Sequence, residues 1–142
     1  MNGVKQILEN YEELKCIYQG LEDVFQIFID ECDNTIIQSN NYMVDNFKRL
    51  LIRVAYAALE LRLLYCPTDV MIDPFYSIVL KFPDERINIA FDMNGEIAIY
   101  LVEGCSLMDV TVETYKVRLN ENYDDLKTKL TNVLHKLKLQ SL

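Results

Sequence analysis

The chain has 142 residues, 51% of them hydrophobic, and a formal net charge of −8 at pH 7. This length fits a single domain, 1–142, with a sizeable core, and the acidic balance disfavours direct nucleic-acid binding, which needs clustered Lys and Arg. No apolar run is long enough to cross a membrane, and the N-terminus lacks the layout of a signal peptide, so we expect a cytoplasmic protein with no membrane partner.

The first expected element is one long helix over residues 3–32. Its apolar positions recur in steps of three and four for about four heptads, which is typical of a helix that packs along its length on another helix. The apolar stripe is wide. It therefore favours a globular bundle and is also compatible with a homodimer through the first or second helix.

A second helix is expected over 41–65. It ends before Pro67, because the residue preceding a proline is pushed out of helical backbone angles. From Leu50 to Tyr65 it is apolar on nearly all sides, which predicts a central helix between the first helix and a sheet. The two helices form an expected helical hairpin over 3–66.

Three alternating apolar runs then predict an antiparallel β-meander, whose first turn is a four-residue loop starting at Pro83. Asn94-Gly95 allows two registers for the second hairpin. A two-residue turn pairs Phe91 with Ala98, whereas a three-residue loop pairs Phe91 with Ile97 and unites the large apolar side chains. We predict the three-residue loop, with glycine at the left-handed position of a bulge. The united face contains Ile78, Leu80, Phe82, Ile87, Ile89, Phe91, Ile97, Ile99 and Leu101.

The meander and a fourth strand, over 110–119, occupy residues 76–119, and a C-terminal helix follows over 123–139. Asn122 is its expected N-cap, with acids in the first turn and lysines in the last, as the helix dipole favours. The predicted fold class is α+β, in the order α-α-β-β-β-β-α, with an antiparallel four-stranded sheet and helices packed on one face.

Catalytic motifs are missing from the sequence. It has no P-loop, GxSxG, GxGxxG or HExxH pattern, and His135, near the end of the last helix, is expected to be a dipole partner rather than a general base. Four widely spaced cysteines are expected to be buried thiols: Cys16, Cys32, Cys66 and Cys105. We therefore expect a protein that is not an enzyme and holds no cofactor or metal.

Acidic residues gather at the start of the chain, where residues 1–40 contain eight acids and two lysines. A solvated helix face explains them most simply. The functional interpretation is a docking strip for a partner protein with a basic surface, since complementary charge speeds association. The candidate residues are Glu9, Glu12, Glu13, Glu22 and Asp23.

The second candidate site is the sheet face opposite the large apolar side chains. It combines small residues with Tyr100, a pattern that allows another surface to approach closely, although an ordinary amphiphilic outer face is the plain alternative. The candidate residues for a partner or an anionic ligand are Val79, Lys81, Asn88, Tyr100, Val102, Lys116 and Arg118.

These features favour a non-enzymatic protein-binding domain of the inhibitor, immunity or phage anti-defence type, which blocks a surface of its partner. In size, charge and element types the chain is similar to immunity proteins, phage-borne inhibitors of bacterial defence and acidic secretion chaperones. Two alternatives are a small anionic-ligand binding or sequestering protein and a secretion-chaperone-like dimer. An enzyme that uses carboxylates and tyrosine is a further alternative.

Overall fold

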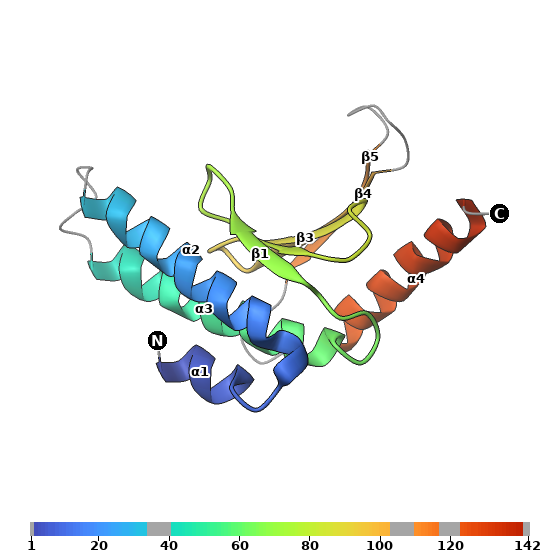
Figure 1. Ribbon diagram of the computed structural model, residues 1–142. Helices are drawn as coiled ribbons and strands as arrows, with labels where there is room; N and C mark the ends of the chain where they lie inside the picture. Colours follow the sequence, from blue (N-terminus) through green and yellow to red (C-terminus); the bar gives the residue numbers. More distant parts are fainter. Residues whose placement is uncertain (1, 34–40, 103–109, 117–122, 141–142) are drawn as a thin grey trace.

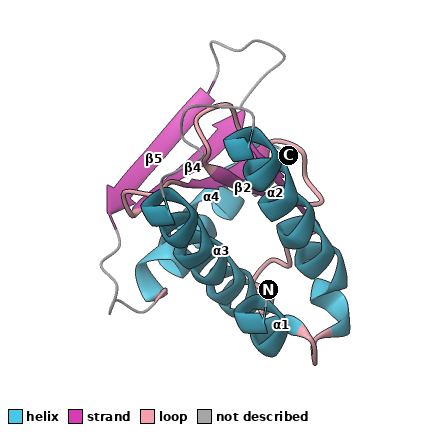
Figure 2. Ribbon diagram, turned by 90° about the vertical axis from the view of Figure 1, so that its left-hand side faces the viewer, coloured by secondary structure: helices cyan, strands magenta, loops and turns pink. Residues whose placement is uncertain are grey.

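A two-layer α+β arrangement, with helices on one face of an antiparallel sheet, is seen in the computed structural model (Figures 1 and 2). The structure describes residues 2–33, 41–102, 110–116 and 123–140. The elements are α1 (Asn2–Leu8), the 3₁₀ turn η1 (Glu12–Leu14), α2 (Lys15–Asp33), α3 (Asn41–Leu61), β1 (Asp69–Ile72), β2 (Ile78–Lys81), β3 (Ile87–Phe91), β4 (Glu96–Val102), β5 (Val110–Lys116) and α4 (Asp124–Gln140). The predicted fold class is confirmed. In the described part of the chain, no helix is both long and apolar enough to cross a bilayer.

The single long helix expected over 3–32 is wrong. The chain leaves α1 after Leu8, and Tyr11 is extended, with φ −116° and ψ 97°. Hydrogen bonds from the Tyr11 N–H to the Leu8 carbonyl and from the Leu14 N–H to the Tyr11 carbonyl close two successive turns. Asn10, a residue that favours turns, lies at the break. The break lets α1 pack on α3 while α2 contacts both α3 and β1.

The central position predicted for the second helix is confirmed. α3 contacts α1, α2 and β2, although it ends at Leu61, four residues earlier than expected. Phe47 at its N-terminal half stacks on Phe28 of α2, with ring centres 4.0 Å apart. The side chains of α3 that are buried in the core are Phe47, Leu50, Leu51, Val54, Ala55, Ala57, Ala58 and Leu61.

The sheet has the strand order β1-β2-β3-β4-β5, so each strand pairs with the next along the chain. Its first strand, β1, precedes the four predicted strands and was not expected. The register is confirmed, since Phe91 pairs with both Ile78 and Ile97 and Gly95 has φ 84°. All nine large apolar residues of the predicted inner face are buried against the helices. The expected end of the fourth strand and the Asn122 cap lie outside the described residues.

Candidate functional site

The helices cover only one face of the sheet and leave the opposite face without a covering helix among the described elements (Figure 2). We call this opposite surface the outer face. Its residues alternate along the strands with those of the inner face, which the helices bury. They are Asp69, Met71, Val79, Lys81, Asn88, Ala90, Glu96, Ala98, Tyr100 and Val102.

The centre of the outer face is an uncharged row that crosses four strands. Met71 pairs with Val79, Val79 with Ala90, and Ala90 with Ala98. Met71 is 44% exposed, whereas the small Ala98 is only 7% exposed. Because three of the four side chains are short, the backbone of these strands is open to close approach by another surface.

A second row carries the polar groups. Asp69, Lys81, Asn88 and Tyr100 are cross-strand neighbours in that order, and Tyr100 is 37% exposed. The side-chain oxygen of Asn88 is buried and accepts no hydrogen bond in the described part of the chain. A buried acceptor without a donor is costly, so Asn88 carries an uncompensated polar group next to the uncharged row.

The structure brings five of the seven predicted outer-face residues together: Val79, Lys81, Asn88, Tyr100 and Val102. Lys116 is placed opposite Glu96 by the β4–β5 register, and Arg118 lies outside the described residues. Lys81 is the one cation of the outer face within the described side chains, and the anionic-ligand site stays a prediction. Asp69 and Met71 were missed because β1 was not predicted.

The acidic residues do not form one helical strip. Glu9 lies in the turn after α1, Glu12 and Glu13 lie in η1, and Glu22 and Asp23 lie on α2. All five are exposed. The arrangement along one side of a single helix is therefore wrong, for the same reason that the long helix is wrong. Their role in binding a partner stays a prediction.

Two of these acids are engaged by neighbouring side chains. Glu13 forms an ion pair with Arg62 at 3.5 Å, and the Arg62 guanidinium also lies 4.6 Å from the centre of the Tyr11 ring. Glu22 accepts a 2.8 Å hydrogen bond from the Tyr18 hydroxyl, and this bond raises the pKa of that hydroxyl. Glu13 thus links η1 to the residue that follows α3, and the Glu22 side chain contacts a residue of its own helix, α2.

The cysteine prediction is only partly correct. Cys32 is buried, Cys66 is half-buried and Cys16 is exposed, and none of these three described cysteines is in a disulfide. Burial raises the pKa of the Cys66 thiol, which lowers its thiolate fraction at neutral pH. Cys105 lies outside the described residues. His135 is exposed on α4, and no cluster of His, Cys, Asp and Glu suited to a metal ion occurs in the part of the chain that the structure describes.

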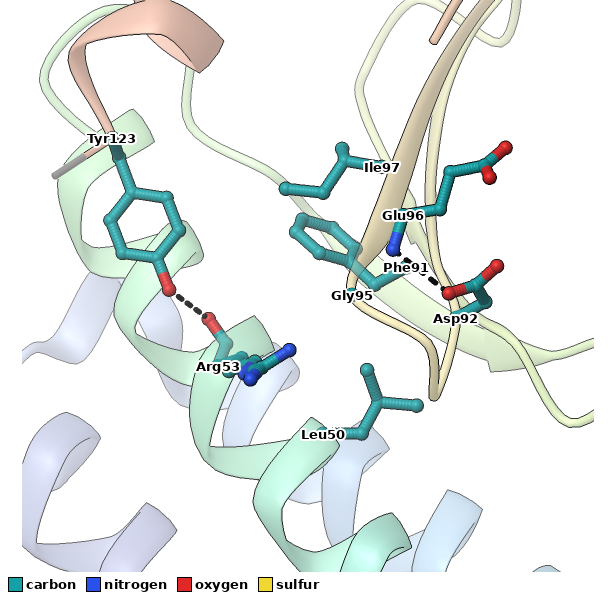
Figure 3. Close-up of a pocket in the computed structure, with 8 residues that line it drawn as sticks. All are labelled: Leu50, Arg53, Phe91, Asp92, Gly95, Glu96, Ile97 and Tyr123. Atoms are coloured by element: carbon teal, nitrogen blue, oxygen red, sulfur yellow. Dashed lines mark hydrogen bonds between the residues drawn. The ribbon is translucent and has the colours of Figure 1, made fainter. Parts of the chain in front are cut away.

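The cavity between α3 and the β3–β4 loop has a volume of about 10 Å³, room for a single water (Figure 3). On one side of this cavity, the Tyr123 hydroxyl donates a 3.1 Å hydrogen bond to the Arg53 carbonyl. Its lining residues are Leu50, Arg53, Phe91, Asp92, Gly95, Glu96, Ile97 and Tyr123. A larger groove of about 410 Å³ between α1 and α3 is wide open and lined mainly by apolar and amide side chains.

No protein-family model matches the chain, and neither a known protein nor a solved structure is found to be similar to it. Its function therefore has to be argued from its surfaces. Of these, the outer face combines an uncharged row of mostly short side chains with the neighbouring polar residues Lys81 and Tyr100.

Proposed function

We propose that this protein is a non-enzymatic protein-binding domain that acts by covering a surface of another protein, as inhibitors and immunity proteins do. One observation supports the proposal most directly. The central row of the outer face, from Met71 to Ala98, carries no charge and no hydrogen-bonding side chain. An antiparallel sheet with one solvated face normally shows polar residues there, so an apolar row suits contact with a partner.

The charge of the chain supports a basic partner. The net charge is −8, and the exposed acids Glu9, Glu12, Glu22 and Asp23 lie on the helical side of the molecule. Attraction between exposed charges is screened beyond the Debye length, about 8 Å in physiological salt, so these acids would act on the approach of a basic partner and not in its contact with the outer face. Short-range contact would then be made by the apolar row and Tyr100, and longer-range attraction would mainly raise the association rate.

The test is a charge placed on the outer face, with a matched charge on the helical layer. Tyr100→Asp introduces a carboxylate beside the apolar row, and Tyr56→Asp introduces the same group on α3, where the tyrosine is 48% exposed. Both variants should remain folded. With a partner purified from the native host, we expect Tyr100→Asp to weaken binding at least tenfold and Tyr56→Asp to change it less than threefold. Unchanged binding by Tyr100→Asp would eliminate the proposal.

Self-association through the same face is a second candidate, and the uncharged row favours it. Two copies that each carry −8 repel one another, so they would meet most readily where neither presents a charge. Sedimentation equilibrium over a range of protein concentrations tests this candidate. A dimer that Tyr100→Asp converts to a monomer supports it, and a monomeric wild-type protein rejects it.

A further inference from the structure

The β1–β2 loop is held by its own hydrogen bonds. The Asp73 N–H donates to the Ser77 carbonyl, and the Tyr76 N–H donates to the Asp73 carbonyl, each at 3.0 Å. The Asp73 carboxylate accepts from the N–H groups of Phe75, at 2.8 Å, and of Ser77, at 2.9 Å. Four bonds thus fix the backbone of a loop with three residues between Asp73 and Ser77.

The β3–β4 loop repeats this construction and serves as an internal comparison. The Asp92 N–H donates to the Glu96 carbonyl at 3.0 Å, and the Asp92 carboxylate accepts from the N–H groups of Asn94 and Glu96, each at 2.9 Å. Its left-handed position is filled by Gly95, with φ 84°. This is the residue for which that backbone conformation carries no steric penalty.

The β1–β2 loop has Tyr76 at the equivalent position, with φ 63°. A tyrosine in the left-handed region is strained, and the strain persists only where surrounding contacts enforce it. Here the Tyr76 ring meets the Phe28 ring edge to face, with centres 5.4 Å apart and planes at 87°. A hydrogen bond with the Glu31 carboxylate raises the pKa of its hydroxyl. The loop is therefore anchored to α2 as well as to itself.

The residue presented by this anchored loop is Phe75, which is 85% exposed and follows the exposed Pro74. The equivalent residue of the other loop is Asn94, a typical polar turn residue. A large aromatic ring exposed on a prefixed backbone loses little conformational freedom on binding, which is the property of an interface anchor. Solvent contact alone gives no reason for a Phe at this position.

We propose that Phe75 is an anchor that inserts into an apolar pocket of a partner protein whose rim carries Lys or Arg. The proposal rests on the protein-binding function above and identifies the partner's chemistry. Asp73 and Glu31 flank the loop with negative charge, which a cationic rim would complement. The same charges, together with the net charge of −8, oppose docking of Phe75 on an anionic lipid surface.

Phe75 lies close along the chain to the outer face. Met71 is the last outer-face residue of β1 before the loop, and it lies two residues before Asp73. The loop projects from the ends of β1 and β2 (Figure 1). A partner seated on the outer face would reach Phe75 by extending past the ends of these two strands.

The experiment places the photocrosslinking residue p-benzoylphenylalanine at position 75, at outer-face position 100, or at position 63 as the control, in cells of the native host. Leu63 is a matched control because it is 82% exposed and follows α3. The protein crosslinked from position 75 is identified, purified and bound to wild type, Phe75→Ser and Leu63→Ser. Circular dichroism establishes that both variants are folded.

We expect a crosslink from position 75. Phe75→Ser should weaken binding about 30-fold or more, as substitutions of anchor residues do, and Leu63→Ser should weaken it less than threefold. Higher salt should slow association of the wild type. A crosslink from position 100 but not from 75 overturns this inference and leaves the proposed function standing, whereas silence at both positions overturns both. A Phe75-dependent adduct of twice the chain mass, or Phe75-dependent binding to phosphatidylcholine–phosphatidylserine vesicles, also overturns it.

Discussion

Gly20 lies where α2 closely approaches Val70 of β1, and Gly20→Ala tests the cost of filling the space between them. Alanine is the better helix former by about 1 kcal/mol, so local propensity alone predicts stabilisation. A Cβ at position 20 would, however, lie 2.3 Å from Cγ2 of Val70 on β1, far inside the usual carbon–carbon contact of about 3.5–4.0 Å. Val70 is buried and β-branched, so its methyl group cannot swing away cheaply.

Overpacking of this kind costs about 1–3 kcal/mol, so we expect a net loss of about 0–2 kcal/mol for Gly20→Ala. Urea unfolding measures the free energy. In a Val70→Ala background the nearest remaining atom of residue 70 is its Cβ, at 3.6 Å, which is an ordinary contact. The same glycine substitution should then stabilise by about 1 kcal/mol.

The refuting result is stabilisation by Gly20→Ala in the wild-type background, or an identical effect in both backgrounds. Gly3→Ala is the control, because its Cβ would meet the flexible end of the Ile52 side chain, with Cδ1 at 3.0 Å and Cγ1 at 3.4 Å, rather than a buried β-branched methyl group. That variant should stay within about 0.5 kcal/mol of the wild type.

Three further predictions concern the sheet and its turns. Ile89→Ala removes a fully buried side chain from the inner face and should cost about 2–5 kcal/mol in urea unfolding; a loss below about 1 kcal/mol would contradict the observed register. Gly95→Ala forces a Cβ into the left-handed region and should cost about 1–2 kcal/mol, and a neutral effect would argue against the bulged loop. A hydrogen bond from Arg86 lowers the pKa of Asp84, so the ionised carboxylate stabilises the fold above the usual carboxyl pKa, and this contribution is lost as pH falls through the folded-state pKa. Asp84→Asn should therefore destabilise the fold at neutral pH by less than about 1 kcal/mol, because the Arg86–Asp84 ion pair is partly exposed. In strong acid the variant and the wild type should be equally stable. A stability difference that is the same at neutral and acid pH would refute this linkage.

The sheet register could be predicted from the sequence because only one hairpin pairing places Phe91 and Ile97 on the same side. The break after α1 could not, since Ile7, Tyr11 and Leu14 keep the four-and-three spacing of a continuous helical stripe across it. β1 is only four residues long, and a run of that length carries too little alternation to be distinguished from a linker.

The outer face was predictable for the same reason as the register, because fixing the pairs fixes which side chains point away from the core. Its edge was not, since Met71 lies on the missed strand. Phe75 was overlooked because a lone aromatic residue between Pro74 and Tyr76 gives no sign of its exposure. An aspartate begins each of the two similar loops, Asp73 in one and Asp92 in the other. In each loop the residue four positions later, Ser77 or Glu96, accepts the hydrogen bond from the aspartate N–H. This shared aspartate is the sequence feature that could have revealed that the two loops are alike.

The sequential strand order has a consequence for how the chain folds. Every strand pairing joins neighbours along the chain, so the sheet can close through short loops, a topology associated with fast folding. The three helices α1, α2 and α3 precede the sheet and are synthesised first. Each hairpin that emerges from the ribosome therefore follows three helices that can cover its inner face, and β5 and α4 join after the earlier strands.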